Sequence, residues 1–210
     1  MKYFFLLIIS CVSISNATIE GVTVRTAIND FSCFPTQGYD FTFIRAFMRT
    51  GKVDPNARAN VIAANRVGMA VNVFIRPCME CNIKPNEIVL KVIKELKGTV
   101  YYSIIVMIQH DDWSPNQTAN CNYLKAMIAE IKRNEKNEAV GANSEVWNTV
   151  MGKNCLIGKD VKNLMWEEHD EEKDIKNFKP FGGFTAPTSK EYAGSVNVCE
   201  HVVDLLYLPQ

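Results

Sequence analysis

Two arginines of the chain have side chains suited to binding an anionic group. Arg45 and Arg76 lie at the ends of two apolar segments, and a guanidinium at such a place can hold a carboxylate through two parallel hydrogen bonds. Arg25 is a third arginine that could bind such a group. The alternative is that these arginines pair with Asp204 or Glu168 in a buried network, and the sequence leaves both interpretations open.

Two tryptophans, Trp113 and Trp166, also follow or end apolar segments. Their flat rings could stack on a sugar, or they could close the hydrophobic core at the end of a strand. We keep Trp166 as a candidate ligand-binding residue beside Arg45 and Arg76.

The segment 160–176 is rich in acids and contains His169. It holds seven acidic residues against three lysines, which favours an exposed face, with a divalent metal site as the alternative. Asp111 and Asp112 predict a solvated loop with a turn or capping role. No ligand spacing identifies a metal site or a cofactor site, so none is predicted.

The chain has seven cysteines, of which Cys11 lies in the apolar leader. The other six could pair in about 15 ways. We expect a small Cys78–Cys81 loop and the pairs Cys33–Cys199 and Cys121–Cys155. A zinc site or a redox motif at Cys78-Met79-Glu80-Cys81 is the alternative interpretation of that pair.

The N-terminus and the composition indicate a secreted protein. Lys2 is followed by an apolar stretch and by Ser15-Asn16-Ala17, so residues 1–17 are predicted to be a signal peptide and 18–210 a single domain. The 210 residues carry 23 basic and 23 acidic side chains, which predicts no nucleic-acid partner. No later segment is apolar enough to span a membrane, and a sequon at Asn116 predicts a glycan.

Short β-branched segments alternate with amphipathic ones, a rhythm typical of βα units around a parallel sheet. Strands are expected at 21–26, 41–47, 70–75, 101–109, 139–143, 163–168 and 202–208, and helices at 56–67, 85–96 and 116–133. The Pro- and Gly-rich segment 173–194 indicates a long loop or an irregular hairpin. These elements predict a compact or incomplete β/α barrel, with an open doubly wound sheet as the alternative, and place the chemistry at the carboxyl ends of the strands.

A series of motifs runs along the chain: GYDFTFIRAF at 38–47, GKVDPNA at 51–57, PCMEC at 77–81, WSPNQTAN at 113–120, PFGGF at 180–184 and EYAG at 191–194. Together they resemble the secreted lysozymes of glycoside hydrolase family 25, in particular those of nematodes and amoebae. The resemblance covers almost all of the chain after residue 17. It implies a flattened, irregular β/α barrel related to enzymes that cleave the β-1,4 bond of peptidoglycan.

The departures from this family fall on its catalytic acids. The family carries an aspartate in the first strand, an Asp-x-Glu pair at the end of the fourth and an aspartate in the last. The matching positions here hold Thr23, Met107 and Gln109, and only Asp204 is retained. Glycoside hydrolysis requires a carboxylic acid and a carboxylate, and an amide has no proton to donate near neutral pH.

The resemblance and these substitutions together predict a non-hydrolytic, lysozyme-like protein that binds peptidoglycan or a related glycan in defence or digestion. Arg45, Arg76, Gln109 and Trp166 are the expected ligand-binding residues, the first two through a carboxylate of the glycan or its peptide. One alternative is an active muramidase that uses Asp204 with a displaced acid, and another is a scaffold for a protein partner. We expect a monomer that is secreted or held in a lysosome-like lumen.

Overall fold

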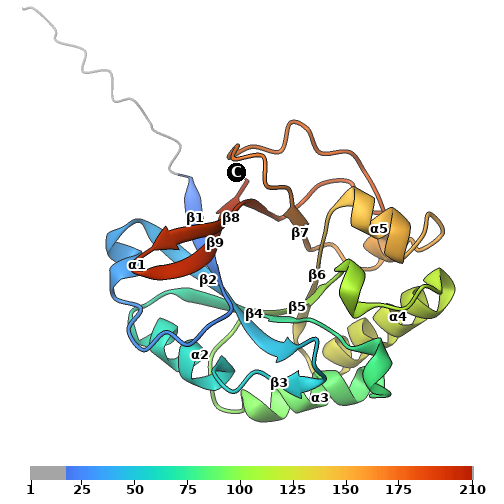
Figure 1. The fold of residues 1–210 in the computed structure, drawn as a ribbon, viewed down its shortest axis with the longest axis horizontal. Coiled ribbons are helices and arrows are strands. Elements are labelled where there is room, and N and C mark those ends of the chain that lie inside the picture. The colour runs from blue at the N-terminus through green and yellow to red at the C-terminus, as the bar shows by residue number, and fades with distance from the viewer. Residues whose placement is uncertain (1–17, 210) are drawn as a thin grey trace, which may run out of the picture.

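The computed structural model describes residues 18–209 and shows a closed β/α barrel (Figure 1). The strands follow one another in a single sheet in the order β1-β9-β8-β7-β6-β5-β4-β2-β3, and a pairing of β1 with β2 closes it. The strands of the ring are β1 (Ile19–Val24), β2 (Tyr39–Met48), β4 (Ala70–Ile75), β5 (Ser103–Met107), β6 (Asn137–Ala142), β7 (Leu164–Glu167), β8 (Ser189–Val198) and β9 (His201–Leu208). The short β3 (Lys52–Val53) only extends the edge of β2. The predicted barrel is therefore confirmed, and the open sheet is excluded.

Neighbouring strands of the ring are parallel except at β9, which runs antiparallel to both β8 and β1. The helices α2 (Ala57–Arg66), α3 (Pro85–Glu95), α4 (Gln117–Arg133) and α5 (Ser144–Val150) lie along one side of the barrel (Figure 1). The β8–β9 ribbon forms the opposite side, where the one-turn α1 (Cys33–Thr36) lies. Three 3₁₀ turns complete the elements: Met79–Cys81, His110–Asp112 and Ile157–Lys159. This asymmetry makes the barrel irregular, as the resemblance implied.

The helices form where the sequence supplies both a start signal and an apolar face. Pro85 occupies the first turn of α3, where its missing N–H is not needed, and Ile88, Val89 and Val92 of that helix are buried. The side chain of Asn116 caps α4 by accepting a hydrogen bond from the backbone N–H of Ala119 at 3.0 Å. None of the helices within residues 18–209 is long and apolar enough to cross a bilayer.

The core has two shells because side chains alternate along each strand. The inner shell fills the barrel with Phe41, Phe43, Phe74, Ile105, Met107, Ala139, Met165 and Leu206. The outer shell packs the barrel against the helices and includes Leu164 and Trp166 of β7. On β7, Leu164 and Trp166 therefore face outward, whereas Met165 and Glu167 face the interior.

Two elements differ from the sequence-based expectations. The segment 173–194 is not entirely a loop, because β8 begins at Ser189, two residues after Pro187. Its first residues, Ser189, Lys190 and Glu191, are polar but almost fully buried, so the sequence lacks the apolar pattern of a core strand. The helices α1 and α5, at four and seven residues, are too short for a clear periodic signal.

All three predicted disulfides are present. Cys33–Cys199 ties α1 to the turn between β8 and β9, and Cys121–Cys155 ties α4 to the segment that follows α5. Cys78–Cys81 closes a small loop after β4. This last bond leaves no thiolate at either cysteine for the alternative zinc site. The predicted signal peptide, 1–17, lies outside the described residues.

Candidate functional site at the barrel mouth

A cleft opens where the parallel strands end. A cavity of about 490 Å³ is lined by Arg25, Gln109, Glu167, His169, Glu171, Glu191, Ala193, Gly194, Ser195, Val196 and Asp204. A second cavity of about 400 Å³ shares Gln109, Glu167 and His169 with it and extends toward the start of α5. Both volumes fall in the range of small-molecule sites, and the location is the one where β/α barrels bind their ligands.

Strand register brings the polar groups of the mouth together in pairs. Thr23 on β1 lies opposite Asp204 on the antiparallel β9. Glu167 on β7 lies beside Glu191 on the parallel β8. Because neighbouring strands are about 4.8 Å apart, each pair places two polar side chains within contact range at the same level of the barrel.

Glu191 is fully buried and is held on two sides. The hydroxyl of Thr23 donates a hydrogen bond to its Oε2 at 2.6 Å, and Nε2 of His169 lies 3.1 Å from its Oε1. That contact with Glu191 is the main reason that the pKa of His169 is raised above its usual 6.5. The ring of His169 lies close to the backbone of Gly194, where a β-carbon would come within 3.0 Å of Cε1. His169 is thus fixed against Glu191 while about half of its side chain stays exposed.

Glu167 is held by the side-chain amide of Gln109. Nε2 of Gln109 donates to both carboxyl oxygens of Glu167, at 2.7 and 2.8 Å. Burial, followed by the negative charge of Glu191, raises the pKa of Glu167 from its usual 4.5 to about 8, although Arg25 and Gln109 oppose the shift. Glu167 therefore holds its proton at neutral pH.

Asp204 is paired with a positive charge. It is 5% exposed, forms an ion pair with Arg25, and accepts a hydrogen bond from the backbone N–H of Ser195 at 2.8 Å. Arg25 also lies 3.8 Å from Glu191 and over the ring of Phe74. Arg25 thus contacts both Glu191 on β8 and Asp204 on β9.

Met107 does not reach the cleft. It is 3% exposed and belongs to the inner shell of the core. Its sulfur occupies the space over Gly141 on the neighbouring strand, where an added β-carbon would lie 2.4 Å from Sδ. Met107 is therefore a hydrophobic packing residue.

Arg45 and Arg76 are paired with acids that the sequence did not suggest. Nε of Arg45 donates to Asp54 at 2.7 Å, and Arg76 holds Asp112 through two bonds of 2.8 and 2.9 Å. The alternative pairing with Asp204 or Glu168 is wrong for Arg45 and Arg76, because each pairs with an acid in the segment that follows a strand end. It is confirmed for Arg25, which pairs with Asp204. Neither arginine lines the two mouth cavities.

The prediction for Asp112 was wrong as well. Asp112 is 3% exposed rather than solvated, and burial raises its pKa against the opposing effect of Arg76. Its neighbour Asp111 is the solvated member, with a side chain that is 73% exposed. The turn His110–Asp112 points one acid inward and the other outward.

Neither tryptophan offers a face to the mouth. Trp166 is 4% exposed because it lies on the outward side of β7, where Phe178 packs edge-on against it and Nζ of Lys190 lies 4.8 Å from its ring centre. Trp113 is also buried, and its Nε1 donates to the backbone oxygen of Met107 at 3.3 Å. Both rings therefore close the core, which was the alternative interpretation.

The acidic segment is organised by a buried lysine. Nζ of Lys190 donates to Asp170 at 2.6 Å and to the backbone oxygens of Glu172 and Asp174 at 2.9 and 3.1 Å. Within residues 18–209, no group of three or more His, Cys, Asp or Glu side chains is arranged to hold a metal ion. The segment forms a rim of the cleft, to which Glu171 contributes.

Glu167 and Glu191 are the site residues that sequence reasoning missed. Glu167 could have been found from strand alternation, since it lies two residues after the inward-facing Met165. Glu191 carried no such signal because β8 begins with polar residues. The mouth thus has three acids on three consecutive strands of the sheet, one of them protonated, and a partly exposed histidine beside them.

Comparisons with known proteins agree with this architecture. A family model described as Lys-1, lysozyme-like protein 1, matches residues 15–192. The chain is 26% identical to "Probable GH family 25 lysozyme 4" of Dictyostelium discoideum over 98% of both chains. It is also 26% identical to "Lysozyme-like protein 5" of Caenorhabditis elegans over 100% of both.

Solved structures show the same fold. The family GH25 lysozyme from Aspergillus fumigatus superposes with a TM-score of 0.75 at 13% identity, over 92% of this chain and 94% of that one. The bacterial lysozyme from Streptomyces coelicolor gives a TM-score of 0.73 at 16% identity, over 93% and 94%. Because the family model matches most of the chain, this protein belongs to the lysozyme-like protein 1 family.

Proposed function

We propose that this protein binds peptidoglycan or a related glycan at the barrel mouth without hydrolysing it, in defence or digestion. The proposal is supported by the contacts of the four residues that the resemblance places at the catalytic positions. Thr23 donates a hydrogen bond to the buried Glu191 and Gln109 donates to the partly buried Glu167, whereas Met107 packs in the core and Asp204 is paired with Arg25.

This arrangement opposes hydrolysis for two reasons. Loss of general acid–base assistance typically costs about 10² to 10⁴ in rate. The acid Asp204 is also matched by the positive charge of Arg25, which reduces its ability to stabilise a developing oxocarbenium ion.

Binding remains possible because the cleft keeps polar groups at an open surface. Gln109 and His169 line both mouth cavities, and the exposed half of the His169 ring is free to contact a ligand. The proposal therefore places Gln109 and His169 at the glycan. It assigns Arg45, Arg76 and Trp166 to the support of the mouth, since each is occupied by contacts within the protein.

Co-sedimentation with insoluble peptidoglycan tests the binding. We expect the purified protein to sediment with it, and His169→Ala to weaken binding about fivefold, the loss expected for one hydrogen bond. His110→Ala is the matched control because His110 is exposed and lines neither cavity. Failure to sediment, together with no thermal shift on addition of soluble muropeptides, would overturn glycan binding in favour of a protein-partner scaffold.

One observation favours a second candidate, an active muramidase. Glu167 holds a proton at neutral pH, as a general acid must, and Glu191 on the neighbouring strand could act as its partner carboxylate. Release of soluble muropeptides that Glu167→Gln abolishes would establish this candidate. Two features argue against an active muramidase: the hydrogen bonds from Gln109 to Glu167 and the burial of Glu191. Both acids are already hydrogen-bonded inside the protein.

We further propose that the protein is secreted, or delivered to a lysosome-like lumen, as a monomer that carries a glycan on Asn116. The three disulfides support an oxidising compartment. Asn116 is exposed, and its cap of α4 uses only Oδ1, which leaves the side-chain nitrogen for glycan attachment. Mass spectrometry of the secreted protein should find Thr18 at the N-terminus and a mass loss on enzymatic deglycosylation.

A further inference from the structure

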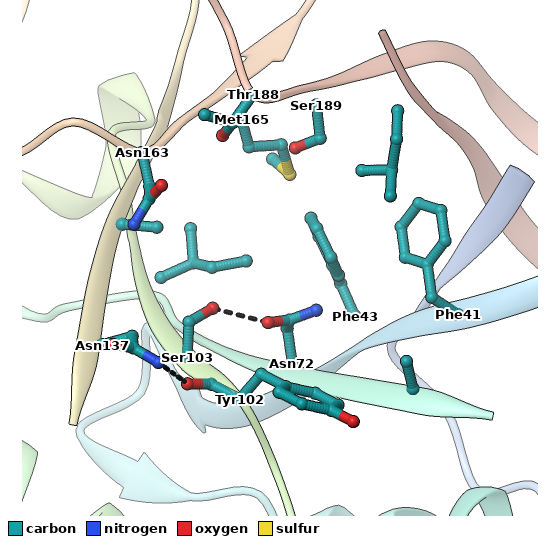
Figure 2. Close-up of a pocket in the computed structure, with 14 residues that line it drawn as sticks. Phe41, Phe43, Asn72, Tyr102, Ser103, Asn137, Asn163, Met165, Thr188 and Ser189 are labelled. Atoms are coloured by element: carbon teal, nitrogen blue, oxygen red, sulfur yellow. Dashed lines mark hydrogen bonds between the residues drawn. The ribbon is translucent and has the colours of Figure 1, made fainter. Parts of the chain in front are cut away.

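A second cavity opens at the other end of the barrel, where the parallel strands begin. Its volume is about 300 Å³, and it shares no residue with the two mouth cavities. Figure 2 shows its lining: Phe41, Phe43, Ala70, Asn72, Tyr102, Ser103, Ile105, Asn137, Ala139, Asn163, Met165, Thr188, Ser189 and Leu208. None of these lining residues is an acid, a base or a histidine.

The wall of this cavity on the β2 side is aromatic. The rings of Phe41 and Phe43 are 5.4 Å apart between centroids and both belong to the inner core of the barrel. Ile105, Ala139 and Met165 continue the apolar floor from β5, β6 and β7. Such a surface accepts the C–H face of a ring but offers nothing to a charge.

Other parts of the lining carry amides and hydroxyls, at or near the starts of β4, β5, β6, β7 and β8 (Figure 2). Three asparagines each use one side-chain atom inside the protein: Oδ1 of Asn72 accepts from Ser103, whereas Nδ2 of Asn137 and Nδ2 of Asn163 donate to backbone oxygens. Within residues 18–209, the other polar atom of each of these side chains has no hydrogen-bond partner. The rim therefore offers one amide donor and two amide acceptors.

Ser189 is the most telling member of the rim. It is only 4% exposed, and its hydroxyl forms no hydrogen bond to any residue in the described part of the chain. Figure 2 shows this side chain directed into the cavity. Because this hydroxyl lines the cavity, a ligand there could exchange a hydrogen bond with it.

We propose that this cavity binds a single neutral pyranose sugar. The apolar face of the ring would pack on Phe41 and Phe43, and its hydroxyls, which both donate and accept, would meet Ser189 and the three asparagines. The absence of charged groups among the lining residues disfavours an ionic ligand. The volume, at the lower limit for ligand sites, suits one ring rather than a chain. This inference does not rest on glycan binding at the mouth.

Titrations followed by NMR test the proposal, because the side-chain amides of Asn72, Asn137 and Asn163 report on the cavity directly. The probes are glucose, galactose, mannose and N-acetylglucosamine, with glucuronate as a charged ring and cyclohexanol as a ring without the hydroxyl edge. We expect at least one neutral sugar to shift these signals saturably. Glucuronate and cyclohexanol should each bind about tenfold more weakly.

Two variants locate the site. Ser189→Ala removes one hydroxyl and should weaken the sugar about fivefold, whereas Ala139→Leu fills the floor and should abolish the shifts. His169→Ala, changed at the other end of the barrel, should leave them intact. Weak specific ligands bind in the roughly millimolar range, so titration up to about 50 mM would detect them. The absence of any asparagine shift with every neutral sugar up to that concentration would overturn the proposal. Equal binding of cyclohexanol, or an unchanged affinity in Ser189→Ala, would also overturn it.

Discussion

The side-chain amide of Gln109, at the end of β5, donates to both carboxyl oxygens of Glu167, at the end of β7. The amide is thus hydrogen-bonded to an acid that the sequence did not place in the site. The contact spans the intervening strand β6 and fixes the two residues across the mouth. It explains how Glu167, buried beside Glu191, is accommodated in the barrel.

Placing an acid at position 109 should therefore destabilise the protein rather than activate it. Gln109→Glu replaces the amide donor with a carboxylate that faces Glu167, and we expect a loss of about 1–3 kcal/mol in the free energy of unfolding at pH 7. Urea denaturation measures this loss. Glu145→Gln serves as the charge control, because Glu145 is an exposed residue that lines the adjoining cavity, and it should change little.

Stability should fall as the pH rises from about 4.5 to about 8. The pKa of Glu167 is about 8 in the folded protein against 4.5 as its usual value, so the folded state binds the extra proton in this interval. The contribution is fully present below the lower value and is lost as the pH passes through the upper one. The raised pKa of His169 acts in the same direction.

Urea midpoints measured at several pH values check this dependence. Glu167→Gln should flatten the curve, and Glu168→Gln, which changes the exposed neighbour, should leave it as in the unmodified protein. A slope that is the same in both variants would show that Glu167 does not titrate as described.

Lys190 should be a major contributor to stability. Its ammonium is fully buried and donates to Asp170 and to two backbone oxygens of the acidic segment. We expect Lys190→Met to cost about 3 kcal/mol by leaving those partners without their donor. Lys176→Met is the control, since Lys176 is exposed in its ion pair with Asp174, and it should give no measurable change in thermal unfolding.

The disulfides should differ in their effect according to the chain length that they close. Cys33–Cys199 spans 166 residues and Cys78–Cys81 only 3. Replacing both cysteines of the long-range pair by alanine should cost up to about 3 kcal/mol more than the same change in the short pair. Equal losses in calorimetric unfolding would contradict a chain-entropy origin.

The barrel, its main helices and the disulfide pairs could be predicted because periodic apolar segments and motif order carry that information. The mouth could be predicted only in part. The residues at family positions were found, but the partners that determine their state, Glu167 and Glu191, depend on strand register between β7 and β8. The pairing of Arg76 with Asp112 likewise depends on a turn whose direction the sequence does not specify.

The central claim is that this barrel binds glycan without cleaving it. The most direct test incubates purified protein with peptidoglycan between about pH 4 and pH 8, the range over which family-type acids titrate, and measures soluble muropeptides by mass spectrometry. We expect no release of muropeptides above that of a heat-inactivated sample. Steady release that disappears in Glu167→Gln would contradict it.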